Sequence, residues 1–541
     1  MTLLADASSH AAAVGRMPQR PFWPWFGALC ALLLTLAALR PLAVPDEGRY
    51  AEIGRWMMMS GDWITPRLNG IPFLHKPPLL HWLEATVQGV LGPSPWSARL
   101  VPALHAALML AGPYVAARRF ATPVFARRAG LMLGASGGFL VGGQYVNHDM
   151  MVAAWIATAI WCFALAFMHG ARPHAGWARA GFVACALGLL SKGLIGLVLP
   201  GAVLFVWLSW TRQWRKVPGL SWLSGLALFA LITVPWFVLI ERSQPGALKY
   251  LFGVHQFGRY TGTTFNNPQP VWFYVAALPL LLFPWAFFAL NRVWAQVQTA
   301  SVATKNVSKP WLDLCWIWLV VILVFFSIPR SKLVGYILPV LPPLAVLAAA
   351  GWERTWAGRR HANRWFGGLL VLALVVPVAI SLVVGRAQGQ KLSGDVAPTL
   401  ACAARPTDTV WVLGGYPYDL PFLIQSPRQL MVVQDWPRVR ATAGDSWRRE
   451  LFEGADFDAA SATALQPEEA LGTASAQPGQ WLMVHNRMAP NEYPPNWPQQ
   501  WQLVQRGSGW NLYRSAPERP PAAEDKGLPG CRDHAGQQRR P

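Results

Sequence analysis

Charged residues are scarce in this sequence. They make up only 13% of its 541 residues, whereas hydrophobic residues make up 53%. A soluble globular domain carries about 25% charged residues, so this composition excludes an ordinary soluble protein. Apolar runs of about 20 residues, the length that spans a bilayer, recur along the chain. We therefore predict a polytopic α-helical membrane protein.

Acidic residues are rarer than basic ones, with 26 Asp and Glu against 46 Lys and Arg, which gives a formal net charge of +20. The basic residues do not form one patch of the kind that binds nucleic acid. They lie in short loops between apolar runs, for example Arg118, Arg119, Arg127 and Arg128. Lys and Arg accumulate in the cytoplasmic loops of membrane proteins. We therefore interpret the charge as a topology signal and expect no nucleic-acid partner.

Cysteine is also rare, and four of the six cysteines fall within apolar runs: Cys30, Cys162, Cys185 and Cys315. Cys402 and Cys531 lie outside them, and the spacings predict neither a cysteine metal site nor a disulfide framework. A small-residue cleavage site is missing after the first apolar run, which we interpret as a retained span. The two halves of the chain also lack the internal repeat that is typical of transporters.

The apolar runs predict eleven crossings, within a range of about 11–13 transmembrane helices. They lie at 26–44, 97–117, 129–146, 150–168, 180–191, 193–210, 219–240, 271–291, 311–328, 333–351 and 365–385. The basic loops then put the amino terminus in the cytoplasm and the carboxyl terminus outside. The predicted domains are a cytoplasmic tail (1–22), a transmembrane domain (23–387), an outer soluble α/β domain (388–515) and a disordered tail (516–541).

The first outer segment, 45–95, is too long for a simple connector. Apolar residues recur at helical spacing around 52–58, and a second amphipathic stretch follows at 79–90, so we expect helices that lie in the membrane interface. In the soluble part, short β-rich runs at 409–413, 430–433, 480–484 and 502–513 predict strands.

Polar residues that hydropathy does not explain all fall on the outer side of this topology. They are Asp46, Glu47, His75, Lys76, His148, Asp149, Lys192, His255, Arg259, Arg330, Ser331 and Lys332. Charged groups near hydrocarbon are costly unless they are paired or line a wet cavity. Because six separate segments supply these residues to one membrane face, we predict a single functional site there.

Structural roles remain open for several of these residues. Asp46 is suited to cap a helix beginning near Gly48, and Glu47 to pair with Arg49 or Arg55. Asp149 is also suited to cap a helix, and Lys192 lies where a break between spans is expected. Lys76 could snorkel to the membrane surface, Arg259 could contact lipid headgroups, and Tyr336 could anchor a helix at the interface.

Several motifs resemble the bacterial lipid A aminoarabinose transferases, a family of the GT-C group that also contains protein O-mannosyltransferases. Residues 44–53 (VPDEGRYAEI) and the run Lys76-Pro77-Pro78 resemble the family's first outer loop. The similarity continues, in order, through 148–151, 191–196, 255–260, 269–274 and 331–339. It covers roughly residues 40–350 and implies a GT-C fold.

The resemblance implies transfer of a sugar from an undecaprenyl-phosphate carrier to an acceptor, commonly a lipid A phosphate, on the periplasmic face of the inner membrane. It implies that Asp46 is the main catalytic carboxylate, with Glu47 and Asp149 as further candidates. The carrier phosphate would be held by a cationic and phenolic set: Lys76, Arg259, Lys192, Lys332 and Tyr336.

One position departs from the family pattern, which has Glu where this chain has His75. In the family that Glu and a loop His, here His255, share a zinc ion, so His75 and His255 are the candidate zinc ligands. Two protein ligands do not make a structural zinc site. The expected reaction therefore requires no cofactor.

We predict an inner-membrane glycosyltransferase that uses a polyprenyl-phosphate sugar, with aminoarabinose favoured by the resemblance. Two alternatives remain open. A protein O-glycosyltransferase would act on Ser or Thr hydroxyls and would need a true base. A lipid or sugar transporter would need a polar path across both leaflets, whereas the polar residues here cluster on one face.

Overall fold

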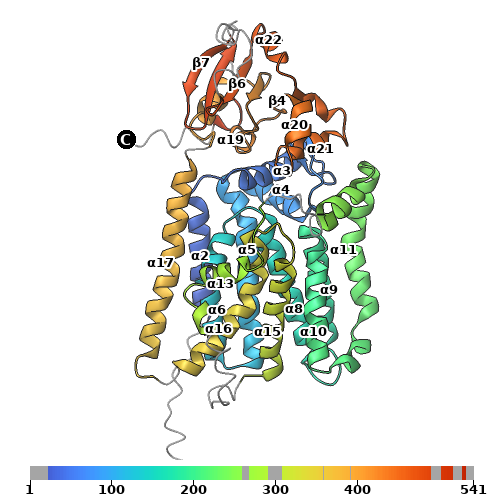
Figure 1. Cartoon of the computed structure of the whole chain (residues 1–541), viewed down its shortest axis with the longest axis vertical. Helices are drawn as coiled ribbons and strands as arrows, with labels where there is room; N and C mark the ends of the chain where they lie inside the picture. Colours follow the sequence, from blue (N-terminus) through green and yellow to red (C-terminus); the bar gives the residue numbers. More distant parts are fainter. Residues whose placement is uncertain are drawn as a thin grey trace, which may run out of the picture.

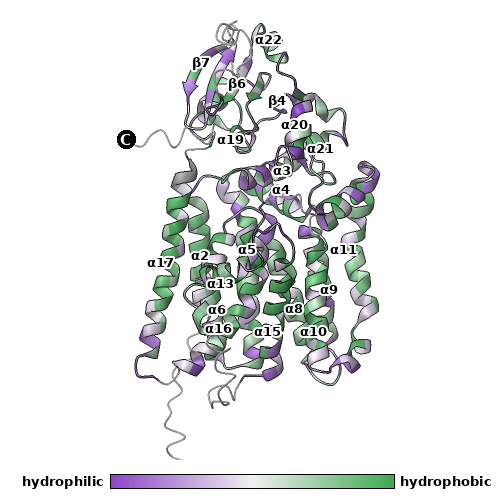
Figure 2. Cartoon of the chain, in the orientation of Figure 1, coloured by the Kyte–Doolittle hydropathy of each residue, from purple (hydrophilic) through white to green (hydrophobic). Residues whose placement is uncertain are grey.

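The computed structural model describes residues 22–258, 267–289, 307–356, 359–389, 392–488, 501–515 and 527–531. In this part of the chain, a bundle of helices carries a smaller sheet domain at one end, with α17 and α11 at opposite edges of the bundle (Figure 1). Hydrophobic residues cover the bundle helices, and hydrophilic residues gather at the bundle ends and on the sheet domain (Figure 2). Such a bundle satisfies its backbone polar groups internally, as a bilayer requires.

The bundle contains long and short helices. The long ones are α5 (Pro95–Phe120), α8 (His148–Phe167), α9 (Ala175–Lys192), α11 (Trp222–Ser243), α15 (Lys309–Ser327) and α17 (Ala362–Gly389), and α16 (Leu341–Thr355) continues the turn η4 into one long apolar stretch. The short ones are α2 (Trp23–Ala38), α6 (Pro123–Gly134), α7 (Gly137–Gly142), α10 (Ile195–Trp210), α13 (Phe273–Leu281) and the irregular turns η1 (Trp214–Gly219), η2 (Lys249–Gly258) and η4 (Val334–Val340). Among the described residues, six helices are long and apolar enough to cross a membrane, with η4 and α16 counted as one.

Local sequence explains where several of these helices begin and end. Ser94 caps α5 in a reciprocal capping box with Ser97. The predicted break between 191 and 193 is confirmed, because α9 ends at Lys192 and Gly193 has a φ of +94° that only glycine adopts readily.

Two predicted spans are interrupted by a break between helices. The stretch 129–146 divides into α6 and α7, because Ser136 caps a new helix by accepting a hydrogen bond from the amide of Phe139. The stretch 271–291 is interrupted after Leu281, where α13 ends. For these two stretches the predicted bounds are wrong, since mean hydropathy does not detect a break inside an apolar run.

The first outer loop contains the two expected helices, α3 (Asp46–Ser60) and α4 (Leu79–Leu91). They pack closely because Gly54 faces α4, and a Cβ at Gly54 would lie 2.4 Å from the Cβ of Glu84. Between them, β1 (Arg67–Leu68) and β2 (Ile71–Pro72) form a hairpin whose turn residues, Asn69 and Gly70, both have positive φ. A turn of this kind favours Asn-Gly.

The soluble domain is built on one mixed sheet of order β5-β4-β3-β6-β8-β7. Its strands are β3 (Thr409–Leu413), β4 (Met431–Val433), β5 (Leu465–Gln466), β6 (Gln480–His485), β7 (Trp501–Arg506) and β8 (Trp510–Ser515). Its helices are α18 (Ala397–Ala403), α19 (Leu420–Ile424), α20 (Trp436–Thr442), α21 (Arg449–Ala455), α22 (Ala470–Ser475) and the turn η5 (Ser461–Ala464). The strands β5, β4, β3 and β6 are parallel, and the predicted run 502–513 is an antiparallel pair, β7 and β8.

The soluble domain docks onto the first outer loop through polar contacts. The side chain of Asn69 donates to the carbonyl of Leu430 (2.9 Å) and accepts from its amide (2.8 Å). Arg55 donates to the carbonyl of Ser426 (2.8 Å). Gly454 of α21 lies so close to β2 that a Cβ there would be 2.1 Å from the carbonyl oxygen of Pro72. This docking brings α21 to the end of the bundle.

A disulfide joins Cys402 to Cys531 across 129 residues of chain. It holds residues 527–531 against the soluble domain, where Leu528 is buried and donates its amide hydrogen bond to Ala401. The expectation of no disulfide is therefore wrong for this pair, and the predicted disorder of 516–541 is wrong for these five residues. Composition alone does not reveal this anchor, because the two cysteines are far apart in sequence.

Candidate active site

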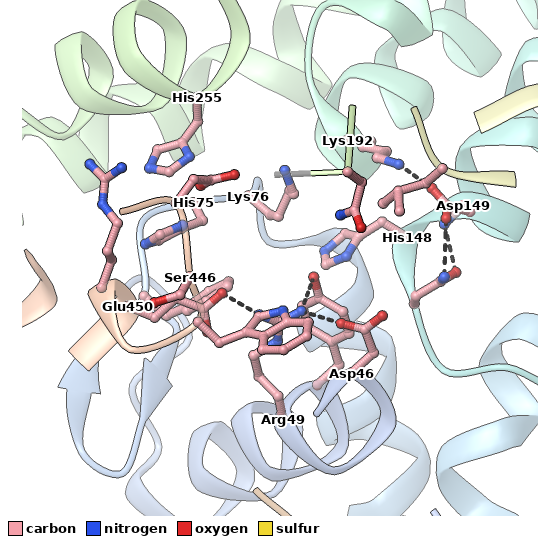
Figure 3. A pocket seen from close by; sticks show the side chains of 18 of the residues that line it. Asp46, Arg49, His75, Lys76, His148, Asp149, Lys192, His255, Ser446 and Glu450 are labelled. Atoms are coloured by element: carbon pink, nitrogen blue, oxygen red, sulfur yellow. Dashed lines mark hydrogen bonds and ion pairs between the residues drawn. The ribbon is translucent and has the colours of Figure 1, made fainter. Parts of the chain in front are cut away.

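A polar cavity of about 380 Å³ lies between the bundle, the first outer loop and the soluble domain. Its lining comes from α3, α8, α9, η2, η4 and the segment around α21 (Figure 3). Eight of the predicted residues line it: Asp46, His75, Lys76, His148, Asp149, Lys192, His255 and Tyr336. The prediction that separate segments converge at one site is confirmed for these residues.

Asp46 is the first residue of α3, so the helix begins earlier than Gly48. Its carboxylate accepts hydrogen bonds from Arg49 and from the hydroxyl of Tyr145 (3.3 Å), and makes no capping bond. The side chain remains one-third exposed. Asp46 therefore keeps an accessible carboxylate in the cavity, and helix capping does not explain its presence.

Glu47 is fully buried and is absent from the described lining of the cavity. Its carboxylate binds Arg99 through two hydrogen bonds (2.9 and 3.0 Å) and also pairs with Arg40. The backbone amides of Ala43 (2.7 Å) and Val146 (3.1 Å) donate to it as well. Burial alone would raise its pKa, but Arg99 and Arg40 lower it to about 2. Glu47 thus pairs with Arg99 and Arg40, and not with Arg49 or Arg55 as the sequence suggested, and its catalytic role stays a prediction.

Asp149 and Lys192, which both line the cavity, form an ion pair. Asn147, which caps α8, donates a further hydrogen bond to Asp149 (3.1 Å). The ammonium of Lys192 lies 4.3 Å from the ring centroid of Tyr336. Gly335 makes room for this group, since a Cβ there would lie 2.2 Å from Oδ2 of Asp149.

One predicted phosphate ligand, Lys332, is bound elsewhere in the described part of the chain. Lys332 is buried, and its ammonium donates to the carbonyl oxygens of Gln269 (3.0 Å) and Pro329, so it supports a loop instead. Lys332 is absent from the described lining of the cavity, and its role as a phosphate ligand stays a prediction. Arg259 lies outside the described residues.

An apolar groove of about 340 Å³ adjoins the cavity. Its walls include Leu194, Val198, Phe257, Phe325, Phe326 and Pro329. Four polar residues line both spaces: Lys76, Lys192, His255 and Tyr336. Figure 3 shows Lys76 between the side of the cavity that carries His75 and the side that carries Lys192. An apolar groove therefore opens into a polar cavity, and two lysines, Lys76 and Lys192, lie where the two spaces meet.

His75, His255 and Glu453 bring possible metal-binding atoms within 4.8 Å of one another. The ring centroids of His75 and His255 lie 4.0 Å apart, and Nε2 of His75 is 3.0 Å from the hydroxyl of Tyr250. Burial, with His255 and Lys76 nearby, lowers the pKa of His75 well below its usual value. Two imidazoles and a carboxylate are a common zinc donor set.

The soluble domain also contributes residues that sequence reasoning missed. Arg449, Glu450 and Glu453 of α21 line the cavity, together with Asp445, Ser446 and Trp447 just before it. No hydropathy signal marks them, because charged residues are ordinary in a soluble domain. Their position in the site follows from the docking of α21 against β2.

The fold and the site define a membrane glycosyltransferase. A family model described as dolichyl-phosphate-mannose-protein mannosyltransferase matches residues 29–251. The crystal structure of ArnT from Cupriavidus metallidurans bound to undecaprenyl phosphate has a TM-score of 0.75 and 25% identity, over 92% of this chain and 99% of that chain. The Archaeoglobus fulgidus oligosaccharyltransferase, 14% identical, shares the fold with a TM-score of 0.54 over 86% of this chain and 69% of its own. These findings confirm the predicted GT-C fold.

Curated relatives narrow the class to one family. An undecaprenyl phosphate-α-4-amino-4-deoxy-L-arabinose arabinosyl transferase of Pseudomonas aeruginosa (strain UCBPP-PA14) is 30% identical over 382 residues, which are 68% of this chain and 67% of the relative. One from Pseudomonas savastanoi pv. phaseolicola is 31% identical over 66% of this chain and 67% of its own length. The chain belongs to this family of arabinosyl transferases. The match spans about two thirds of these relatives.

Family membership confirms the prediction of a polyprenyl-phosphate-sugar-dependent glycosyltransferase over that of a transporter.

Proposed function

We propose that this enzyme transfers 4-amino-4-deoxy-L-arabinose from undecaprenyl phosphate to a phosphate group of lipid A. The observation that carries this proposal is the junction between the apolar groove and the polar cavity, formed by Lys76, Lys192, His255 and Tyr336. A donor with an isoprenoid tail and a sugar phosphate head has the same two parts, an apolar one that fits the groove and a polar one that fits the cavity. The identity of the sugar in this proposal is taken from the names of the relatives.

The reaction would take place on the periplasmic face of the inner membrane. The disulfide between Cys402 and Cys531 supports this orientation, because disulfides persist in the periplasm and are rare in the cytosol. The basic loops at the other end of the bundle agree with it.

In the proposed reaction, an acceptor oxygen attacks the anomeric carbon, and the bond from that carbon to the carrier phosphate breaks. The bonding electrons leave with undecaprenyl phosphate, whose growing negative charge is stabilised by Lys76 and by Lys192 beside it. A single displacement of this kind inverts the anomeric centre.

Asp46 is the proposed catalytic carboxylate. Its partly exposed carboxylate lines the cavity from the start of α3, and the Asp149–Lys192 pair lines the same cavity. An acceptor phosphate that is already ionised hardly needs a base, so Asp46 would act mainly by orienting the acceptor. Asp149 would orient Lys192 and, through it, the carrier phosphate.

His75, His255 and Glu453 would hold a zinc ion, for which the donor set and the clustering of their ligand atoms are suitable. Bound there, zinc would supply positive charge beside the carrier phosphate. Elemental analysis of the purified enzyme and of its His75→Ala variant tests this, and an equal zinc content in the two would contradict it.

The experiment that tests the function uses the purified enzyme in proteoliposomes, with undecaprenyl-phosphate aminoarabinose as donor and lipid A as acceptor. We expect mass spectrometry to detect modified lipid A with the wild type and none with Asp46→Asn. Transfer to a Ser- or Thr-containing peptide instead of lipid A would favour a protein O-glycosyltransferase. Full activity of Asp46→Asn would refute the role of Asp46.

A further inference from the structure

Glu450 enters the active site from the soluble domain. It lies in the first turn of α21, is only 8% exposed and lines the cavity. The close approach of Gly454 to Pro72 fixes α21 against the first outer loop. Glu450 is therefore held at the site only while the two domains are docked.

Arg49 connects Glu450 to the proposed catalytic carboxylate. Its Nη1 pairs with Glu450, and its Nη2 pairs with Asp46 (Figure 3). The same Nη2 donates to the hydroxyl of Tyr50 (3.1 Å), and the guanidinium lies 4.5 Å from the centroid of the Tyr50 ring. One buried guanidinium is thus shared between a carboxylate of the soluble domain and a carboxylate of the membrane domain.

We propose that Glu450 is a positioning residue, which holds the Arg49 guanidinium so that it binds Asp46 through one oxygen and leaves the other for the acceptor. Oδ1 of Asp46 bonds to Arg49, whereas Oδ2 has the longer contact to Tyr145 (3.3 Å). A planar guanidinium that is released from Glu450 is free to bind both oxygens of Asp46, because bidentate pairing is its preferred geometry. This inference rests on the proposed function.

Charges around Glu450 make its effect dependent on pH. Burial raises the pKa of Glu450 to about 7, although Arg49 and, more weakly, Lys76 favour the ionised form. Asp46 adds repulsion from α3, and the hydroxyls of Tyr50 and Tyr418 also face this group. As the pH rises through about 7, Glu450 loses its proton and its ion pair with Arg49 becomes stronger.

The test is a double-mutant cycle on the full-length enzyme in proteoliposomes. We expect Glu450→Gln to lower kcat by between about 10- and 100-fold, the size of effect that misplacement produces, with little change in KM for the donor. Glu450→Asp, which keeps the charge, should recover part of the rate. In an Arg49→Ala background, Glu450→Gln should cause no further loss, because both act through one interaction.

Two further readouts separate positioning from a structural role. The rise of wild-type kcat around pH 7 should be absent in Glu450→Gln. Hydrogen exchange in the first turn of α3 should increase in this variant. Glu468→Gln, the same substitution at an exposed site of the same domain, should leave both unchanged.

A wild-type kcat for Glu450→Gln would overturn the proposal. So would a double variant whose loss of kcat equals the product of the losses of the two single variants, Arg49→Ala and Glu450→Gln. If the wild type itself transfers no aminoarabinose, the proposed function fails. The exchange measurement still decides the structural link in that case, and unchanged exchange at residues 46–49 in Glu450→Gln would overturn it.

Discussion

Asp46 and Glu47 are adjacent carboxylates with opposite surroundings. Asp46 is one-third exposed and meets the cavity, whereas Glu47 is fully buried between Arg40 and Arg99. Successive residues of a helix point about 100° apart, so one turn of α3 supplies a reactive group and a structural anchor. The anchor holds the start of α3, which carries Asp46.

Glu47→Gln should destabilise the protein by about 3–5 kcal/mol, because it leaves buried arginines without their counter-charge. The pKa of Glu47 is lower in the folded protein than in the unfolded chain. Its stabilisation is therefore complete above about pH 4.5 and is lost as the pH falls toward about 2. Thermal unfolding in detergent at several pH values measures both effects. An unchanged unfolding midpoint with loss of transfer would instead indicate a catalytic role.

At the level of secondary-structure elements, the hairpin β1–β2 couples the two domains. Asn69 uses its positive φ to turn the hairpin and both ends of its amide to bind the backbone of Leu430. Gly454 and Pro72 then bring α21 against β2. The geometry of the active site thus depends on a turn that touches no substrate.

Asn69→Gly should loosen the docked soluble domain by about 1–3 kcal/mol. Glycine accepts the positive φ, so the variant removes the two hydrogen bonds without straining the turn. We expect faster hydrogen exchange in α21 and the hairpin, and lower transfer activity because Glu450 is held less firmly. Unchanged exchange in α21 would show that the hairpin does not secure the domain.

The sequence predicted those parts of the structure that a large free-energy cost enforces. Unbroken apolar runs gave helices such as α5, α8 and α11, because burial in lipid demands them. The polar residues of the membrane domain were found because charge near hydrocarbon is costly. Charged residues such as Glu450 and Glu453 are ordinary in a soluble domain and give no such signal. The exposure of Asp46 and the burial of Glu47 depend on where α3 begins. Those details required the tertiary structure.

At the scale of the whole molecule, the proposed function requires the soluble domain and the cavity to lie outside the cytoplasm. The disulfide offers a direct test of this orientation. Cys402 is an exposed residue of α18, and its only described covalent partner is Cys531. The four remaining cysteines are half-buried or buried in the bundle helices: Cys30, Cys162, Cys185 and Cys315.

Cys531→Ala should therefore create one accessible thiol on the soluble domain. We expect a membrane-impermeant maleimide to label this variant in intact spheroplasts, because the reagent reaches only the outer face of the inner membrane. The wild type and the Cys402→Ala/Cys531→Ala variant should remain unlabelled, since the bundle cysteines are shielded by packing and lipid. Labelling of Cys531→Ala only after the membrane is permeabilised would put the domain in the cytoplasm, where the proposed periplasmic transfer to lipid A could not occur.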